Sequence, residues 1–332
     1  MTPAASELRR DLIELGGAGI EIVELGPAGG APAPRTGPGV VRVGAHRRGD
    51  LPRDGLDRFD ILLATAPDAP RPWVVAPASG IDAALEQLRR QVERQPAAAA
   101  AAAQVLRMTL KLAFDEALAL ESFAYSMLLA SDGFRSWRAA TPPRTRPEPP
   151  GPRVLVEARE GAILIRLNRP ERRNAFDARM RDELAEALAF ALDHPDAPPV
   201  ILSGAGPVFS AGGDLDEFGQ AGDVGLAHLI RTLRTPAGLV QALGERLTAR
   251  VHGPCVGAGI EVPAAAARVT AAPGASYRLP EVSMGLIPGA GGTASIPRRI
   301  GRQRAAYMAI SGAEIDLATA LAWGLVDAEA PT

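Results

Sequence analysis

A proline-dense segment, PPRTRPEPPGP at residues 142–152, divides this 332-residue chain into two parts with different patterns. Proline fixes φ and has no N–H to donate, so such a run is extended and continues neither a helix nor a sheet. The sequence therefore predicts three parts: an N-terminal region at 1–141, a proline-rich linker at 142–152 and a C-terminal domain at 153–332.

The N-terminal region is predicted to be mainly helical. Helices are expected within 80–139: one capped by Asp82, a second through an alanine run to about Leu120, and a third over 121–130. Shorter features precede them: a helix and a strand within 6–25, a glycine- and proline-rich loop at 26–39, and two apolar runs within 59–76. This is the most aromatic part of the chain. Its large side chains are expected to lie in the core or in an oligomer contact: Phe123, Tyr125, Met127 and Trp137.

The C-terminal domain alternates strands with helices. Residues 154–159 and 162–167 alternate apolar and polar side chains on either side of Glu160 and Gly161, which is typical of an antiparallel hairpin. A helix capped by Asp177 follows, and later apolar runs end in glycine turns that open further helices. This order predicts an α/β domain.

Composition excludes several classes of function. A formal net charge of −2 offers no basic surface for nucleic acid, and one cysteine with four scattered histidines predicts no metal site. The N-terminus lacks the apolar stretch of a signal peptide, and no run approaches the length of a membrane span. We therefore expect a cytoplasmic protein without a membrane or nucleic-acid partner.

Glycine-rich turns are the first candidate site. The turns at 210–214, 257–261 and 289–292 fit neither the GxGxxG nor the GxxxxGKS nucleotide-binding pattern. The first two follow apolar strands and open helices, where backbone N–H groups are unpaired. Facing each other, they would form an oxyanion hole for a carbonyl oxygen. Spacing alone favours the simpler interpretation, in which glycine only serves the tight turns.

Two glutamates in apolar surroundings are the second candidate. Glu261 opens an apolar helix, and Glu281 lies in the apolar stretch YRLPEVSMGLIPG. Burial raises the pKa of a carboxyl group, as a general acid requires. In the alternative interpretation, Glu261 only favours a helix N-terminus and Glu281 is exposed. Together with the glycine turns, the pair favours acid–base chemistry on a carbonyl compound.

Residues 154–328 resemble the crotonase (enoyl-CoA hydratase/isomerase) superfamily along nearly their whole length. The matching segments are LNRPERRNAF (167–176), GPVFSAGGDLDEF (206–218), VHGPCVGAGIE (251–261), YRLPEVSMGLIPGAGGTASIPRRIG (277–301) and ALAWGLVDA (320–328). The resemblance implies an α/β fold, a crotonase-like spiral of ββα units, and acyl-CoA substrates.

The resemblance also implies roles for individual residues. The oxyanion-hole donors fall on the N–H groups of Gly213 and Ala258, and the two catalytic carboxylates fall on Glu261 and Glu281. Segments that hold coenzyme A in the family align with 168–175 and 211–215. The implied coenzyme A contacts are Arg172, Arg173, Ala175, Ala211, Gly212, Asp214, Leu215 and Gly257. Arg172 and Arg173 would pair with phosphates or be solvated.

The chain departs from the family at both ends. Family members usually continue past the motif GLVD with helices that close the acyl pocket and form trimer contacts, whereas this sequence stops at Thr332. Residues 73–143 resemble that region, which suggests a permuted order. We expect the helices within 80–139 to cover the acyl pocket.

The resulting functional prediction is an enoyl-CoA hydratase that adds water to a 2-enoyl-CoA. It requires no metal or redox cofactor, since coenzyme A is part of the substrate, and it is expected to form a homotrimer or hexamer. Isomerisation or hydrolysis of an acyl-CoA is the alternative within the superfamily. From another class, a non-catalytic coenzyme A-binding or assembly partner is the alternative that the unusual N-terminal region favours.

Overall fold

The computed structural model describes residues 19–26, 37, 39–147 and 150–330. These residues form three β-sheets and two groups of helices, joined by loops. The helix expected before residue 19 and most of the loop expected at 26–39 lie outside these residues. Within them, no helix is long and apolar enough to cross a membrane.

A small parallel sheet opens the described chain. Its strands pair in sequence order: β1 (Gly19–Glu24), β2 (Val40–His46), β3 (Ile61–Ala64) and β4 (Val74–Val75). The apolar runs noted within 59–76 form β3 and β4. All of β2 and β3 is buried, as is usual for parallel strands that are covered on both faces.

Four helices follow the sheet: α2 (Ile81–Arg94), α3 (Pro96–Thr109), α4 (Phe114–Leu129) and α5 (Asp132–Ala140). The cap prediction at the first helix was wrong, because Gly80 is the N-cap and Asp82 lies in the first turn, where its carboxylate pairs with Arg47. The expected helix end near Leu120 and the start at residue 121 were also wrong.

The helix break falls between α3 and α4 because tertiary contacts hold the chain there. The hydroxyl of Thr109 donates to the carbonyl oxygen of Thr293 at 2.8 Å, and the carbonyl of Leu112 accepts from Arg298 at 2.8 Å. The carboxylate of Glu116 accepts from the N–H of Ala113 at 2.8 Å, which satisfies a donor at the start of α4.

The C-terminal part contains a six-stranded sheet with the order β13-β10-β8-β7-β6-β5, and a three-stranded sheet with the order β12-β11-β9. The strands are β5 (Val154–Arg159), β6 (Ala162–Leu167), β7 (Val200–Gly204), β8 (Leu247–Val251), β9 (Pro254–Val256), β10 (Arg268–Ala271), β11 (Ser276–Arg278), β12 (Ile315–Asp316) and β13 (Ala328–Glu329). The predicted hairpin is confirmed: β5 and β6 are antiparallel, with positive φ at Glu160 and Gly161.

The helices of this part are α6 (Ala178–Leu192), α7 (Val224–Leu233), α8 (Pro236–Leu243), α9 (Ala258–Glu261), α10 (Gly292–Ile300), α11 (Arg302–Ser311) and α12 (Leu317–Trp323). As predicted, Asp177 caps α6, and its carboxylate accepts from the N–H of Met180 at 2.6 Å. Between α5 and β5, the described residues of the linker form neither helix nor strand.

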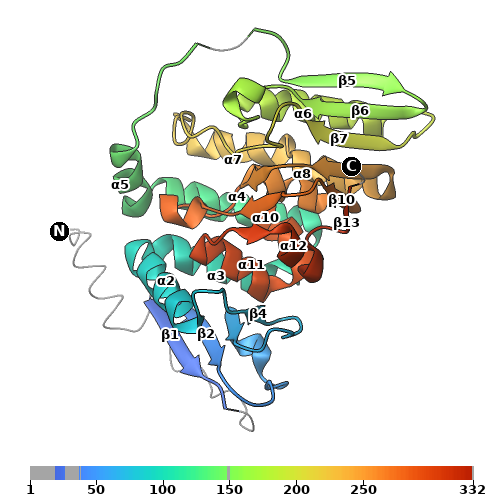
Figure 1. Cartoon of the computed structure of the whole chain (residues 1–332). Helices are drawn as coiled ribbons and strands as arrows, with labels where there is room; N and C mark the ends of the chain where they lie inside the picture. Colours follow the sequence, from blue (N-terminus) through green and yellow to red (C-terminus); the bar gives the residue numbers. More distant parts are fainter. Residues whose placement is uncertain (1–18, 27–36, 38, 148–149, 331–332) are drawn as a thin grey trace, which may run out of the picture.

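The two parts of the chain share one hydrophobic core. Figure 1 shows α2, α3 and α4 in the middle of the molecule beside α10 and α11, with β1 and β2 on one side and β5 to β7 on the other. A single cluster of buried apolar side chains joins the two parts, including Leu88, Leu106, Leu128, Ile260, Ile296 and Tyr307. The helices of the N-terminal region therefore belong to the interior of the C-terminal fold.

Candidate active site

The two glycine turns predicted from the sequence lie side by side. The N–H of Val256 donates to the carbonyl oxygen of Ser210 at 3.0 Å, and a Cβ on Gly212 would stand 3.6 Å from the Cα of Gly257. Among the described residues, the N–H groups of Gly213 and Ala258 have no protein acceptor. Two unpaired donors in neighbouring turns can bind one carbonyl oxygen.

Glu261 and Glu281 approach the same point beside the second turn. Glu261 ends α9, and Glu281 begins a 3₁₀ turn, Glu281–Met284; their residues are 2% and 7% exposed. A Cβ on Gly257 would collide with Oε1 of Glu281 and lie 3.6 Å from Oε1 of Glu261. The structure therefore brings together the two carboxylates that the sequence singled out.

The two carboxylates differ in their hydrogen bonds. Oε2 of Glu261 accepts from the N–H groups of Ala290 at 2.7 Å and Gly292 at 3.0 Å, at the start of α10. Oε2 of Glu281 is buried and has no hydrogen-bond partner among the described residues. Hydrogen bonds from N–H groups stabilise a carboxylate anion, whereas an unpartnered buried oxygen favours the neutral acid.

The two environments raise the pKa values of Glu261 and Glu281 to different extents. Burial raises the pKa of Glu261 to about 7, against the opposing effect of the N–H groups that it accepts from. Burial and the negative charge of Glu261 raise the pKa of Glu281 well above its usual range. Near neutral pH, Glu261 can thus act as a base while Glu281 retains a proton to donate.

A third buried carboxylate, from the N-terminal region, lies in the same place. Oε1 of Glu121 on α4 accepts from the N–H of Gly291 at 2.7 Å, and its Oε2 accepts from the N–H and the hydroxyl of Thr293, each at 2.7 Å. The sequence indicates only a helix start at residue 121. Its position on the same helix face as Leu118 and Tyr125 was the available signal.

Aromatic side chains from both parts of the chain pack near the candidate site. Tyr125 packs against Gly289, where a Cβ would stand 2.5 Å from the ring. The Phe218 ring packs against Gly213 in the same way, and its centroid lies 6.2 Å from that of Trp137 on α5. The backbone of α5 at Phe134 also contacts Gly285, four residues after Glu281.

The segments expected to hold coenzyme A also meet. The N–H of Ala211 donates to the carbonyl oxygen of Arg173 at 2.9 Å, so the segment with Arg172, Arg173 and Ala175 lies beside the segment 211–215. Arg173 is exposed, and Arg172 donates to the carbonyl oxygen of Pro147 at 3.2 Å. Neither arginine is paired with an acid among the described residues.

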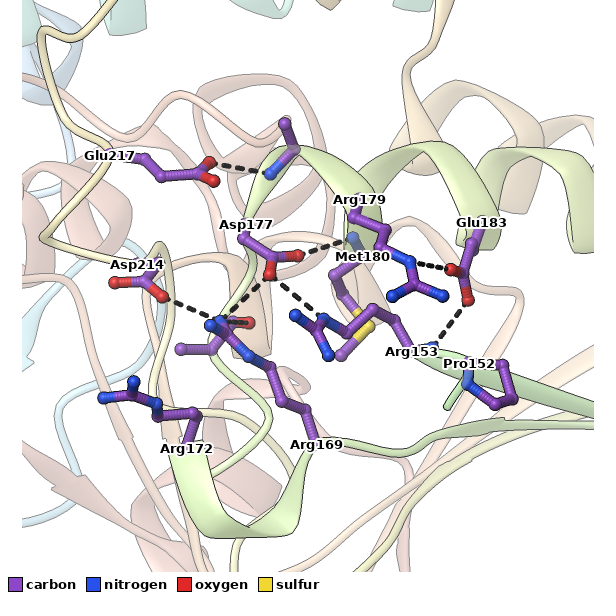
Figure 2. A network of polar contacts seen from close by, with 12 residues as sticks. Pro152, Arg153, Arg169, Arg172, Asp177, Arg179, Met180, Glu183, Asp214 and Glu217 are labelled. Carbon is purple, nitrogen blue, oxygen red and sulfur yellow. Dashed lines mark hydrogen bonds and ion pairs between the residues drawn. The ribbon is translucent and has the colours of Figure 1, made fainter. Parts of the chain in front are cut away.

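The buried Arg169, which was not predicted as a site residue, links the segment 168–175 to Asp214 by an ion pair. Its guanidinium is buried and lies 2.7 Å from the carboxylate of Asp214 and 3.3 Å from that of Asp177 (Figure 2). Asp177 also pairs with Arg153 at 3.1 Å. Figure 2 shows the Arg172 side chain pointing away from this network. The carboxylate of Asp214 is therefore engaged within the protein.

The C-terminal part of the chain, which contains both turns and both carboxylates, matches a known family. Residues 157–332 match the family model described as enoyl-CoA hydratase/isomerase. The chain belongs to the enoyl-CoA hydratase/isomerase family. The fold predicted from the sequence, a crotonase-like spiral of ββα units with a mainly helical N-terminal region, is confirmed, although the N-terminal region also contains the sheet β1–β4.

Similar proteins of the enoyl-CoA hydratase/isomerase family come from fungi and bacteria. An enoyl-CoA isomerase/hydratase of Mycosarcoma maydis is 33% identical over 180 residues, which cover 52% of this chain and 66% of that protein. The 2,3-dehydroadipyl-CoA hydratase of Escherichia coli is 32% identical, over 52% of this chain and 67% of that protein. An enoyl-CoA hydratase structure from Bacillus anthracis has a TM-score of 0.50 at 32% identity, covering 54% and 70% of the two chains.

The match covers only part of this chain and only part of each relative. The chain spans slightly less than two thirds of the length of the M. maydis relative. The family model begins at residue 157, so Glu121, Tyr125 and Trp137 lie outside the matched residues. The residues of the candidate site thus come from both sides of the linker.

Replacing Gly257 by alanine is expected to disable the site. Gly257 has φ +49°, which costs an alanine about 1–3 kcal/mol, and the new Cβ would collide with the Glu281 carboxylate. We expect Gly257→Ala to lower turnover at least tenfold, about the loss that follows a small displacement of a catalytic group, and to lower Tm. Gly274→Ala is the matched control, because Gly274 also has positive φ but open space around it. Full turnover by Gly257→Ala would show that the Glu281 position is not needed.

Proposed function

We propose that this protein is an enoyl-CoA hydratase, a hydro-lyase that adds water across the double bond of a 2-enoyl-CoA. The observation that carries the proposal is the approach of two buried carboxylates, Glu261 and Glu281, to one point beside two turns with unpaired N–H groups. Family membership supports an acyl-CoA thioester as the substrate.

In the proposed mechanism, the thioester oxygen binds between the N–H groups of Gly213 and Ala258. These donors polarise the enoyl system and stabilise the enolate that forms as water adds, each contributing about 2.7–4 kcal/mol on the scale of other oxyanion-hole donors. Glu261 orients the water and takes its proton as the oxygen attacks C3. Glu281 delivers a proton to C2, so that H and OH are added across the double bond.

The N–H groups of Ala290 and Gly292 support this division of roles. They hold Oε2 of Glu261, which leaves Oε1 on the side of Gly257 and Glu281. The coenzyme A part would lie along 168–175 and 211–215, with Arg172 and Arg173 available for its phosphates. Phe218 and Trp137 would contribute to the wall of the acyl pocket.

A panel assay on the full chain tests the proposal. Hydration of 2-enoyl-CoA thioesters removes the absorbance of the conjugated thioester, isomerisation of 3-enoyl-CoA thioesters creates it, and hydrolysis releases a free thiol. We expect the first signal. Thiol release or isomerisation alone would assign another reaction of the family, and binding of acyl-CoA without any reaction would favour a coenzyme A-binding partner.

We also propose that the protein assembles into a homotrimer or hexamer. Helices α4 and α7 pack together and leave large apolar side chains exposed: Phe123, Met127, Leu226, Leu229 and Leu233. Contiguous apolar surface of this kind is usually covered in an assembly. Light scattering at micromolar concentration is expected to give the mass of three or six chains. A mass of one chain would contradict the proposal.

A further inference from the structure

Two carboxylates divide the N–H groups of a single turn at the start of α10. Glu261 takes those of Ala290 and Gly292, and Glu121 takes those of Gly291 and Thr293. The four consecutive donors therefore alternate between a side chain of the matched C-terminal part and one of the N-terminal region. A shift of either carboxylate would disturb the donors of the other.

No cation forms an ion pair with these carboxylates among the described residues, although the positive charge of Arg278 lowers the pKa of Glu281 and Arg231 interacts electrostatically with Glu121. Glu121 is 2% exposed and forms no ion pair. Arg231 of α7 also packs on α4, but its guanidinium donates to the hydroxyls of Ser122 and Ser126, and its Cζ lies 5.0 Å from the Tyr125 ring centroid.

Glu281 adds a third carboxyl to the same apolar interior. Its Oε2 is buried without a hydrogen-bond partner among the described residues, and the negative charges of Glu261 and Glu121 raise its pKa. Three neighbouring carboxyls without an ion-paired cation cannot all be ionised without a large cost in free energy, so they titrate as a coupled set. The helix N-terminus favours negative charge on the two that contact it.

We propose that Glu121 is a positioning residue for Glu261: by holding Gly291 and Thr293 it fixes the turn that anchors Oε2 of Glu261, and the two buried carboxyls titrate as a coupled pair. This inference rests on the proposed function for the catalytic role of Glu261. The anchoring and the coupling themselves rest on the contacts of Glu121 alone.

Glu121→Gln is the direct kinetic test. Glu121 uses both oxygens for three donors, whereas the amide offers one acceptor oxygen and presents an NH₂ group to the other donors. We expect kcat for a 2-enoyl-CoA to fall about 10- to 100-fold, the scale of a misplaced catalytic group, with KM unchanged. Because the N–H groups of Ala290 and Gly292 lower the pKa of Glu261, loosening their turn is expected to move the acid limb of the kcat–pH profile to higher pH.

Leu118→Ala is the matched control for loosening of α4. Leu118 lies one turn before Glu121 and contacts the same turn at Gly291, but it carries no charge. This variant is expected to lower Tm without moving the acid limb. A fall in kcat of Glu121→Gln with an unmoved acid limb would reduce Glu121 to a structural residue and overturn the proposal.

Thermal unfolding between pH 5 and pH 9 gives a readout that needs no substrate. Burial and the charge of Glu261 raise the pKa of Glu121 from 4.5 to about 8, so the folded state retains a proton that the unfolded state loses. The stabilisation is present at low pH and is lost as pH rises toward 8. The Tm of the wild type, relative to that of Glu121→Gln, should therefore fall from pH 5 to pH 9.

The outcomes separate the two proposals. A constant Tm difference across this range would overturn the coupling, whatever reaction the enzyme catalyses. If no 2-enoyl-CoA is hydrated but the Tm difference changes as expected, the hydratase proposal fails and the coupling stands. Should Glu121→Gln not fold, Glu121→Asp, which keeps the carboxyl group but shortens the side chain, is expected to lose at least tenfold in kcat; full activity would overturn the positioning role.

Discussion

Glu261→Gln and Glu281→Gln are each expected to lower the hydration rate by at least about 100-fold, the usual contribution of a general acid or base. Glutamine keeps the shape of each side chain but can neither take the proton of water nor deliver one to C2. Binding of coenzyme A thioesters should survive, because both side chains lie beside Gly257 and not in the segments 168–175 and 211–215. Stopped-flow or steady-state absorbance and calorimetric binding measure the two effects separately.

The hydration rate of the wild type is also expected to depend on the protonation of Glu261 and Glu281. The rate is expected to rise with pH through about 7, as Glu261 loses its proton, and to fall at higher pH once Glu281 loses the proton that it must donate. Glu157→Gln, at an exposed position on β5, is the control and should keep both limbs. Near-normal hydration by Glu261→Gln or Glu281→Gln would remove that residue from the mechanism.

Deleting residues 1–145 is expected to abolish activity and soluble expression. The deletion removes α3 and α4 from a core that they share with α10 and α11, and it removes the Glu121 contacts to Gly291 and Thr293. The exposed apolar surface would then drive aggregation. Soluble yield and hydration rate measure the effect, and a soluble, fully active fragment would refute the structural role of the N-terminal region.

Cutting the linker without deleting anything is the matched control. Arg144 and Arg146 are exposed in the segment between α5 and β5, so a protease site can be placed there. We expect the nicked protein to keep its activity, because the two fragments remain joined by the common core. Loss of activity on nicking would indicate that the covalent connection, and not the packing, holds the site together.

Local signals in the sequence predicted much of the C-terminal part. The hairpin around Glu160 and Gly161 and the cap at Asp177 depend on residues close in sequence, and both are confirmed. The resemblance to a family identified Glu261 and Glu281, and the structure brings them together. These features depend on local chemistry or on a motif, which a single sequence displays directly.

Features set by distant contacts were not predictable. The break between α3 and α4 has no glycine or proline, and contacts from Thr109 to Thr293 and from Leu112 to Arg298 hold it. Glu121 resembles an ordinary helical glutamate until its partners are known. Contacts between residues 170 or more positions apart cannot be predicted from spacing alone. The pairing of β1–β4 was not predicted either, because short apolar runs are ambiguous between helix and strand.

The order of elements along the chain has a consequence for synthesis on the ribosome. Helices α3 and α4 are made early, but the helices against which they pack, α10 and α11, are among the last to be made. The alanine-rich α3 contacts α2, α4 and β2, which are also made early, but the part of its apolar face that packs on α10 and α11 stays uncovered until residues near 311 leave the ribosome. Because late-covered apolar surface is prone to aggregation, newly made chains of this protein should depend on chaperones that shield the N-terminal helices until translation ends.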